Sequence, residues 1–445
     1  MNGGSNALIK LDNWFENNPN ITNARYAFYN CKNMIGSLNE YPHIIAEKSK
    51  LTNAEYMFTG CSGISGDLPS DYFKGCTALQ NINNHFQNCS GITGSITTSM
   101  WEDCSNITYA NYLFSGCSGL GGITGAMQEI PKDFFRGKFN LSEAKGMFNG
   151  CSQLTFSLMP KEDTDIPWFV DCRKLSKISE MFKGCQNCHS EIPSRLFEVW
   201  DNEGNVIESF ISEASGLFNG CRLIQGEIPG NLFDKFVKVR DLSNFFNGCE
   251  NLVGGIPDEL FANCYSLVYA NSMFENCKRL GRYAEDITIA NPYFCSEELL
   301  WNCTNLVSVA NMFDSNLNGT SLRGEIPPLL FRTCTKLQNI SGIFYGCGLL
   351  TGGLDAQLFA NNGKITNAQE AFLGCSGLNG ELSANLFTFS KNPNITNFYK
   401  TFSGCGNLTG SAPPLWSQFS GANGTYCFSG CSKLENYDAI PDQWK

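Results

Sequence analysis

The chain has 445 residues, a formal net charge of −11 and a sequence pI near 4.9, and only 16% of its residues are charged. Its 34 phenylalanines and 42% hydrophobic content exclude a disordered chain, because such a composition supplies a large apolar core. Lysine and arginine are scattered without a basic run and no apolar stretch reaches the roughly 18 residues of a membrane span, so neither nucleic-acid binding nor membrane insertion is expected.

The N-terminal residues, MNGGSNALIKLDNWFENN, show no basic segment followed by an apolar run. No secretory signal peptide is therefore visible. For a surface protein this leaves two options: the chain is a fragment, or it reaches the outside by another route, such as release in a virus particle.

A phrase of the form MFxGC recurs along the whole chain, and we call its aromatic residue the first anchor. Fourteen first anchors occur, about 31 residues apart, and 13 of them are followed three residues later by a cysteine; the exception is Asn316. The first anchors are Phe28, Phe58, Phe86, Phe114, Phe148, Phe182, Phe218, Phe246, Phe274, Phe313, Phe344, Phe372, Phe402 and Phe428.

A second anchor is predicted between successive first anchors, often also followed by a cysteine. The predicted second anchors are Phe73, Trp101, Phe135, Phe169, Phe197, Phe233, Phe261, Trp301, Phe331, Phe359, Phe387 and Trp416. Between the two anchors lie segments such as ISGDLP (64–69), whose alternation predicts short strands joined by tight turns. The glycine in these segments should allow close approach of neighbouring coils, and the proline should end the strand.

A unit of this length cannot bury its own apolar face, so neighbouring units must stack around one continuous core. We therefore expect a repeat solenoid of about 14 coils of 28–39 residues, with short parallel strands and no long helices, forming a single domain over residues 1–445. Neither end shows an obvious polar cap, so end-to-end contacts are also expected.

The phrase MFxGCxxL, preceded by ITNA (21–24, 365–368) or LTNA (51–54), resembles the bacterial surface-protein class of leucine-rich repeats, the BspA-like repeats. Segments of the form LxGxIP (252–257, 322–327) also look like the strand-ending segment of plant-type leucine-rich repeats. The resemblance covers nearly the whole chain and implies a leucine-rich-repeat-like fold, here expected in a phage-borne member of the family. It does not imply a ligand, because members of such a family bind different things.

The 22 cysteines are best explained by the repeat. Equivalent cysteines of stacked coils would lie about 4.8 Å apart with parallel side chains, a poor geometry for disulfides, so buried thiols are expected. Unpaired thiols fit folding in a reducing cytoplasm. The expected structural core ladder includes Phe58, Cys61, Phe73, Cys76, Phe274 and Cys277.

One stretch, CQNCH, has the form of a c-type haem attachment motif at Cys185, Cys188 and His189. It occurs once and uses a repeat cysteine, so coincidence is the preferred interpretation, with no haem, metal or other cofactor expected. His85 occupies the methionine slot before Phe86 and is expected at the edge of the core. No catalytic signature is present, and an enzyme is not expected.

Several Asn-x-Ser/Thr triplets recur at equivalent repeat positions, and their asparagines are interpreted as turn and stacking residues first and glycan acceptors second. These asparagines include Asn20, Asn106, Asn140, Asn394 and Asn407.

Insertions break the repeat near residues 119–131, 158–167, 198–213 and 281–298. They should project from one side of the stack, and Trp200, Tyr283 and Tyr293 are the candidate binding-loop residues. The expected partner is a protein or a surface carbohydrate receptor, and other virion proteins are further candidates.

These observations favour a non-enzymatic structural or receptor-binding surface module. The preferred setting is the virion surface, as a bacteriophage protein that mediates attachment or decorates the particle. The alternative is an extracellular bacterial cell-surface adhesin or host-interaction leucine-rich-repeat protein. Neither the ligand nor the oligomeric state can be derived from these residues.

Overall fold

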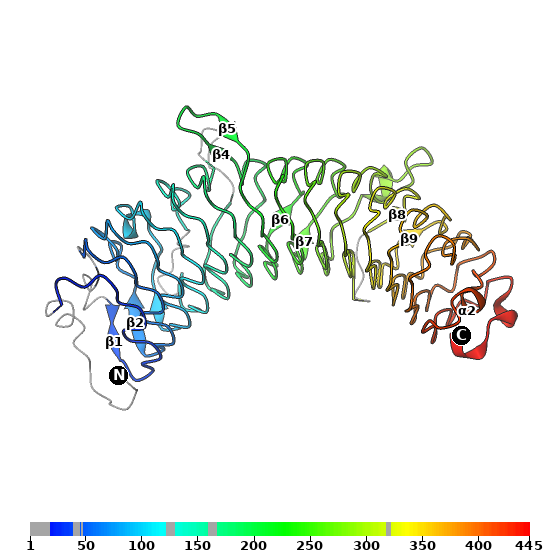
Figure 1. The fold of residues 1–445 in the computed structure, drawn as a ribbon, viewed down its shortest axis with the longest axis horizontal. Coiled ribbons are helices and arrows are strands. Elements are labelled where there is room, and N and C mark those ends of the chain that lie inside the picture. Colours follow the sequence, from blue (N-terminus) through cyan, green and yellow to red (C-terminus); the bar gives the residue numbers. More distant parts are fainter. Residues whose placement is uncertain (1–17, 39–44, 46–47, 122–129, 159–166, 317–321) are drawn as a thin grey trace. The chain divides into compact units, whose positions relative to one another are not determined.

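The computed structural model describes residues 18–38, 45, 48–121, 130–158, 167–316 and 322–445. The chain divides into two compact units, Met1–Ile224 and Gln225–Lys445. Within each unit, successive coils lie side by side (Figure 1). The extent of one solenoid domain over the whole chain stays a prediction.

The regular elements are short. In the first unit, β1 (Gly36–Ser37), β2 (Ile64–Asp67) and β3 (Ile92–Thr93) form one parallel sheet, and β4 (Val199–Trp200) pairs antiparallel with β5 (Val206–Ile207). In the second unit, β6 (Gln225–Gly226) pairs with β7 (Asn251–Leu252) and β8 (Gly324–Glu325) with β9 (Leu350–Thr351), both in parallel. The helical turns are η2 (Thr98–Met100), η3 (Ala284–Asp286), α2 (Leu415–Gln418), η4 (Tyr437–Ala439) and η5 (Asp442–Trp444).

The predicted fold class is confirmed. The segment ISGDLP forms β2, which pairs in parallel with a strand of the preceding coil and a strand of the following coil. Equivalent pairings recur in both units, each between neighbouring repeats. The protein is a leucine-rich-repeat-like solenoid of short parallel strands.

A second ladder runs through the residues that precede the first anchors. In each unit, the residues five positions before the seven first anchors form parallel bridges from one coil to the next. In the first unit these residues are Asn23, Asn53, Asn81, Tyr109, Glu143, Lys177 and Glu213, and in the second Asp241, Tyr269, Ser308, Asn339, Asn367, Asn397 and Asn423.

Regular strands do not form at the first anchors. Residues two before and, with one exception, two after each anchor have positive φ, as at Tyr56 (56°) and Gly60 (74°). Such residues break the extended conformation of a strand, so the chain makes turns here. The N–H groups of Tyr56 and Phe58 still donate to the next coil, to the carbonyls of Asn83 (2.9 Å) and His85 (3.0 Å).

The core of each unit is a column of stacked phenylalanine rings. Phe58 lies between Phe28 and Phe86, with ring centroids 5.2 and 5.9 Å away and nearly parallel planes. Phe274 lies in the same way between Phe246 and Phe313, at 6.0 and 5.8 Å. The first anchors therefore bury aromatic surface against the same residue of the neighbouring coils, which a single coil could not do.

Two predicted second anchors were wrong. Leu300 and Leu415 are fully buried, whereas Trp301 is 42% exposed and Trp416 is partly exposed. Spacing explains the first case, because Cys303 lies three residues after Leu300, as cysteines do after other anchors. The Trp301 ring is instead covered by the guanidinium of Arg332, 4.0 Å from the ring centroid.

His85 lies deeper than expected. It is completely buried among aromatic rings rather than at the edge of the core. Its Nδ1 faces the Ala54 carbonyl (2.8 Å), which can only accept, so Nδ1 carries the proton. Nε2 then accepts the hydroxyl proton of Tyr72 (3.0 Å), so both polar groups are satisfied inside the core.

Asparagines of the Asn-x-Ser/Thr triplets join neighbouring coils. The Nδ2 atoms of Asn106, Asn394 and Asn407 donate to the backbone carbonyls of Thr77 (2.8 Å), Gly363 (2.7 Å) and Ser376 (2.9 Å). These bonds support their interpretation as stacking residues.

The C-terminal end of the second unit carries a cap that the sequence analysis did not anticipate. The carbonyls of Gln443 and Trp444 accept the N–H groups of Tyr426 (3.0 Å) and Phe428 (2.8 Å). Equivalent N–H groups elsewhere donate to the next coil, so η5 occupies the place of a further coil. The buried Trp444 ring lies on Gly424, where a Cβ atom would come within 2.2 Å of it.

Candidate functional site

The predicted core-ladder residues lie inside the stack. Phe58, Cys61, Phe73 and Cys76 are fully buried, and Phe274 and Cys277 are 2% and 1% exposed. The thiols of Cys61 and Cys277 donate to the carbonyls of Phe28 (3.0 Å) and Phe246 (3.1 Å), the first anchors of the preceding coils. The Cys76 thiol donates to the Ile45 carbonyl at 3.0 Å. These residues hold coils together and present no surface to a ligand.

Burial also makes these thiols unreactive. It raises the pKa of Cys61 to about 12 and the pKa of Cys76 to about 11, because a thiolate would lose its hydration there. Nucleophilic attack and metal ligation both use the thiolate. The ladder cysteines are therefore packing and hydrogen-bonding residues.

The CQNCH motif does not form a site. Cys185 and Cys188 are fully buried, whereas His189 is exposed, so the three side chains do not converge. The Cys185 thiol donates to the Phe148 carbonyl (3.2 Å), as the repeat pattern requires. Among the residues that the structure describes, no group of three or more His, Cys, Asp or Glu side chains could hold a metal ion.

The insertion at 198–213 forms the β4–β5 hairpin and uses Trp200 locally. Its indole Nε1 donates to the Glu198 carboxylate (3.3 Å), and the Arg195 guanidinium lies 5.5 Å from the indole ring centroid. Most of the insertions at 119–131 and 158–167 lies outside the described residues.

The insertion at 281–298 brings its two candidate residues to different places. Tyr283 precedes η3 and is 49% exposed. Tyr293 instead rejoins the strand ladder, where it bridges Glu325 in parallel. Of the three candidate binding-loop residues, Tyr293 lines a cavity.

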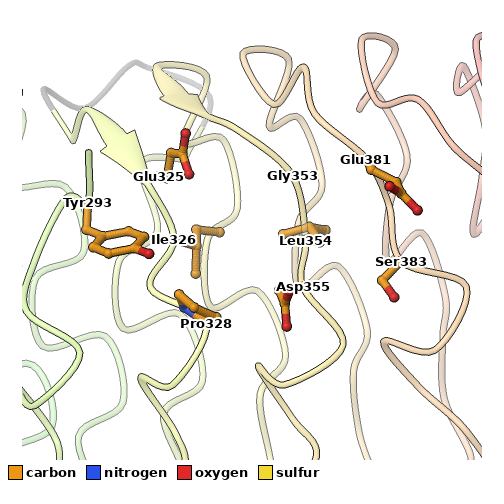
Figure 2. A pocket seen from close by; sticks show the side chains of 9 residues that line it. All are labelled: Tyr293, Glu325, Ile326, Pro328, Gly353, Leu354, Asp355, Glu381 and Ser383. Atoms are coloured by element: carbon orange, nitrogen blue, oxygen red, sulfur yellow. The ribbon is translucent and has the colours of Figure 1, made fainter. Parts of the chain in front are cut away.

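That cavity is a groove of about 370 Å³ along the strand ladder of the second unit, and we call it the Tyr293 groove. It is lined by Tyr293, Glu325, Ile326, Pro328, Gly353, Leu354, Asp355, Glu381 and Ser383. Figure 2 shows the Tyr293 ring at one end and the other lining residues on the neighbouring strands. The groove therefore crosses three consecutive coils beyond the insertion.

Glycines of the strand segment determine where its acidic side chains lie. A Cβ atom at Gly352 would come within 2.7 Å of the Glu325 side chain, and one at Gly410 within 2.5 Å of the Glu381 side chain. Each acidic stem thus packs over the glycine of the next coil. Gly353 opens the floor of the groove, where a Cβ atom would lie 2.4 Å from the Glu381 carbonyl oxygen.

The Tyr293 groove is acidic and lacks internal charge neutralisation. Among the described residues, no lysine or arginine forms an ion pair with Glu325, Asp355 or Glu381. Burial and the carboxylates of Glu297, Glu325 and Asp355 raise the pKa of Tyr293, because they oppose a phenolate. Tyr293 therefore offers a neutral hydroxyl beside three carboxylates, which together suit a hydrogen-bond-donating cation.

Comparisons with known proteins gave one partial family match and no curated relative. The model of a family described as "Mycoplasma protein of unknown function, DUF285" matches residues 3–123. No curated protein matches the sequence at a significant level.

Solved structures similar to this chain include leucine-rich proteins of two bacteria. A leucine rich cell surface protein from Faecalibacterium prausnitzii is 14% identical with a TM-score of 0.29, covering 80% of this chain and 74% of that one. A leucine-rich repeat protein from Bacteroides ovatus is 16% identical with a TM-score of 0.33, covering 88% and 85%. The Toll chain of the Drosophila Toll–Spatzle complex is 14% identical with a TM-score of 0.26, covering 80% and 51%. The fold assignment rests on the strand and anchor ladders of this chain.

Sequence reasoning missed the acids of the groove. Glu325 and Glu381 directly follow the strand glycine, a repeat position also held by Asp67 and Glu227, so the pattern was visible as Gly-Asp/Glu. Which of these acids share a cavity depends on the place of the insertion.

In the described part of the chain, none of the helices has the length and apolar character of a membrane span.

Proposed function

We propose that this protein is a non-enzymatic binding module whose Tyr293 groove holds cationic side chains of a protein partner. The observation that carries the proposal is the row of Glu325, Asp355 and Glu381 on three consecutive coils beside a cavity, where no lysine or arginine of the described residues forms an ion pair with them. Arginine and lysine would supply the missing counter-charges and the hydrogen-bond donors for the Tyr293 hydroxyl.

The groove favours a protein partner over a carbohydrate. Sugar sites typically offer an open aromatic face, whereas this groove presents a partly buried carboxylate at Glu325 and exposed carboxylates at Asp355 and Glu381, which attract a cation electrostatically. Carbohydrate binding is the alternative outcome of the experiment below.

We further propose a surface setting, with the virion surface preferred. All 22 cysteines hold thiols without a disulfide, which fits folding in a reducing cytoplasm before release in a particle. The bacterial cell surface is the other candidate, favoured by the repeat phrase itself. Genes for capsid or tail proteins next to this one would support the first setting, and a bacterial surface locus would support the second.

The binding proposal is tested with two probes, hexa-arginine peptide and the neutral sugar maltohexaose, by calorimetry at two salt concentrations. We expect the peptide to bind with an affinity that falls as salt rises. The triple variant Glu325→Gln, Asp355→Asn, Glu381→Gln should weaken it at least about tenfold, because it removes three charge-assisted contacts.

A matched control separates the groove from the overall acidity of the chain. The triple variant Glu227→Gln, Asp258→Asn, Glu259→Gln removes the same charge from exposed residues of the same unit that do not line the groove. It should bind the peptide like the wild type. Equal weakening by both triple variants would contradict the proposal, and binding of the sugar alone would replace the cationic partner with a carbohydrate.

A further inference from the structure

The insertion at 281–298 interrupts the strand ladder beside the Tyr293 groove. On its near side, Gly281 bridges Gly254 of the preceding coil in antiparallel orientation. On its far side, Tyr293 bridges Glu325 of the following coil. The wall of the groove is therefore formed by a segment that has left the ladder and returned to it.

One guanidinium group, that of Arg282, donates hydrogen bonds to three backbone carbonyls of this insertion. Arg282 Nη1 donates to the carbonyls of Tyr293 (2.7 Å) and Asn291 (3.4 Å), and Nη2 donates to the Asp286 carbonyl (2.5 Å). The planar guanidinium can serve several acceptors at once, which a lysine ammonium of the same charge cannot do in this geometry.

The stem of Arg282 is fixed as well as its head. A Cβ atom at Gly255 would come within 3.0 Å of Arg282 Cγ, so the arginine chain lies on the glycine of the neighbouring coil. Arg282 thus joins the regular ladder at Gly255 to the returning segment at Tyr293.

The returning segment is held from its other side by backbone bonds. The Glu325 N–H donates to the Pro292 carbonyl (2.7 Å), and the Phe294 N–H donates to the Glu325 carbonyl (3.0 Å). Tyr293 lies between these two bonds, with its own carbonyl bound to Arg282. Its backbone is therefore fixed on both edges.

We infer that Arg282 is a positioning residue of the Tyr293 groove: it holds the insertion so that Tyr293 forms the groove wall. The role in binding rests on the proposed function, whereas the clamping of the insertion does not. A preorganised wall costs a ligand less ordering entropy than a loose one.

The test compares Arg282→Ala and Arg282→Lys with Arg279→Ala. Arg279 is exposed and carries the same charge three residues away without a contact to the insertion backbone, so it is the matched control. Both Arg282 variants should speed hydrogen exchange of the amides of residues 286, 287, 288 and 291 at least about tenfold, and Arg279→Ala should not.

The direction in which the affinity for hexa-arginine changes distinguishes a positioning effect from a charge effect. Loss of a positive charge near an acidic groove should by itself tighten binding of a cationic peptide, and Arg279→Ala should show this or no change. Both Arg282 variants should instead weaken binding, about fivefold or more, because the wall is no longer held. Arg282→Lys keeps the charge, so weakening by this variant separates positioning from electrostatics.

Each outcome decides one of the two claims. If exchange is faster but peptide binding is unchanged or tighter, Arg282 has only a structural role and the inference is overturned. Unchanged exchange in the Arg282 variants would also overturn the inference. If the wild type does not bind the peptide, the proposed function is wrong, and the exchange rates alone decide whether Arg282 clamps the insertion.

Discussion

At the scale of single residues, the position three after an anchor commonly carries a buried hydrogen-bond donor, although Phe236 after Phe233 shows that an apolar ring also fits there. Cysteine is the usual donor, giving its thiol proton to the carbonyl of the equivalent anchor one coil earlier, as Cys89 does to Phe58 (3.0 Å). A thiol combines small volume, apolar character and a weak donor. The recurrence of cysteine is thus explained by its contacts rather than by redox chemistry.

Some coils that lack this cysteine place another donor in the stack. Lys138 is 1% exposed, and its Nζ donates to the Trp101 carbonyl (2.8 Å) where other coils use a thiol. Burial lowers the pKa of this lysine, because the ammonium is removed from water. Asn362, three residues after Phe359, donates in the same way to the Phe331 carbonyl (3.1 Å), and Asn392, five residues after Phe387, donates to the Phe359 carbonyl (3.0 Å). Cysteine, lysine and asparagine thus share only the donor.

The coil of Phe313 lacks the cysteine after its first anchor and carries a buried acid. Asp314 follows Phe313 in the coil where Asn316 replaces the cysteine, and it is 7% exposed. Burial raises its pKa to about 7, and the nearby carboxylates of Glu275 and Glu370 act in the same direction. The Asn316 N–H donates to the carboxylate, which partly offsets these effects.

This acid predicts an unusual pH dependence of stability. Between pH of about 4 and 7 the folded state keeps a proton that the unfolded state has lost, so the free energy of unfolding should fall as pH rises through this window. Asp314→Asn keeps the shape and removes the charge, so it should stabilise the second unit by about 3 kcal/mol at pH 8 and have little effect at pH 4. Urea unfolding at both pH values measures this difference.

A neighbouring acid provides the control for that experiment. Glu227→Gln removes an exposed carboxylate of the same unit and should leave the slope unchanged. A gain from Asp314→Asn that is equal at pH 4 and pH 8 would show that the carboxyl group is not held protonated.

In the first unit His85 should act with the opposite sign. Burial lowers its pKa to about 4, so its contribution to stability is lost as pH falls from about 6.5 to 4.

At the scale of elements, the hydrogen bonds at the first anchors give each stack a direction. The N–H groups at and two before the anchor donate forward to the next coil, so the last coil of a stack presents donors without acceptors. In the second unit, η5 supplies those acceptors from Gln443 and Trp444. A segment without the repeat phrase can thus end a stack, because only its carbonyls and one aromatic ring are needed.

This cap predicts a local loss of protection when Trp444 is removed. Trp444→Ala should destabilise the second unit by about 3 kcal/mol or more, the usual cost of truncating a buried aromatic side chain. Hydrogen exchange at the amides of Tyr426 and Phe428 should become faster, since their acceptors lie in the same segment.

Two further variants define the result. Gly424→Ala should have a similar effect, because its methyl group would overlap the indole ring. Trp301→Ala, which removes a tryptophan of the same unit that is 42% exposed, should leave the exchange of Tyr426 and Phe428 unchanged. Unchanged protection at these two amides in Trp444→Ala would show that η5 does not cap the stack.

At the scale of the whole molecule, nearly all cysteine thiols are buried. All 22 cysteines are reduced, one of them (Cys31) is partly exposed, and the other 21 are buried. A thiol reagent needs both access and a thiolate, and burial removes both. The protein should therefore behave toward such reagents as if it contained a single cysteine.

Thiol titration tests this directly. Without reductant, the native protein should react at about one thiol and the denatured protein at all 22. Cys31→Ser should abolish the native signal and reduce the denatured count by one. Recovery of far fewer thiols under denaturant would show that disulfides are present and that the ladder description is wrong.

The anchors, the reduced cysteines and the parallel strand at residues 64–67 could be predicted from sequence because each depends on a local phrase repeated every coil. The second anchors at Trp301 and Trp416 were wrong because both a leucine and a tryptophan are apolar, and only packing decides which one faces inward. Tyr293 was identified by composition, yet nothing in its insertion indicates that it returns to the strand ladder while Tyr283 stays outside.

The sequence by itself therefore determined the solenoid, since periodic apolar residues can be buried only by stacking equivalent coils. The tertiary structure decided where function can lie. The Tyr293 groove joins residues more than 80 positions apart, and its acids differ from equivalent acids such as Glu227 only in what lies beside them. That difference comes from an insertion clamped by Arg282, a contact between a side chain and three backbone carbonyls that no residue pattern encodes.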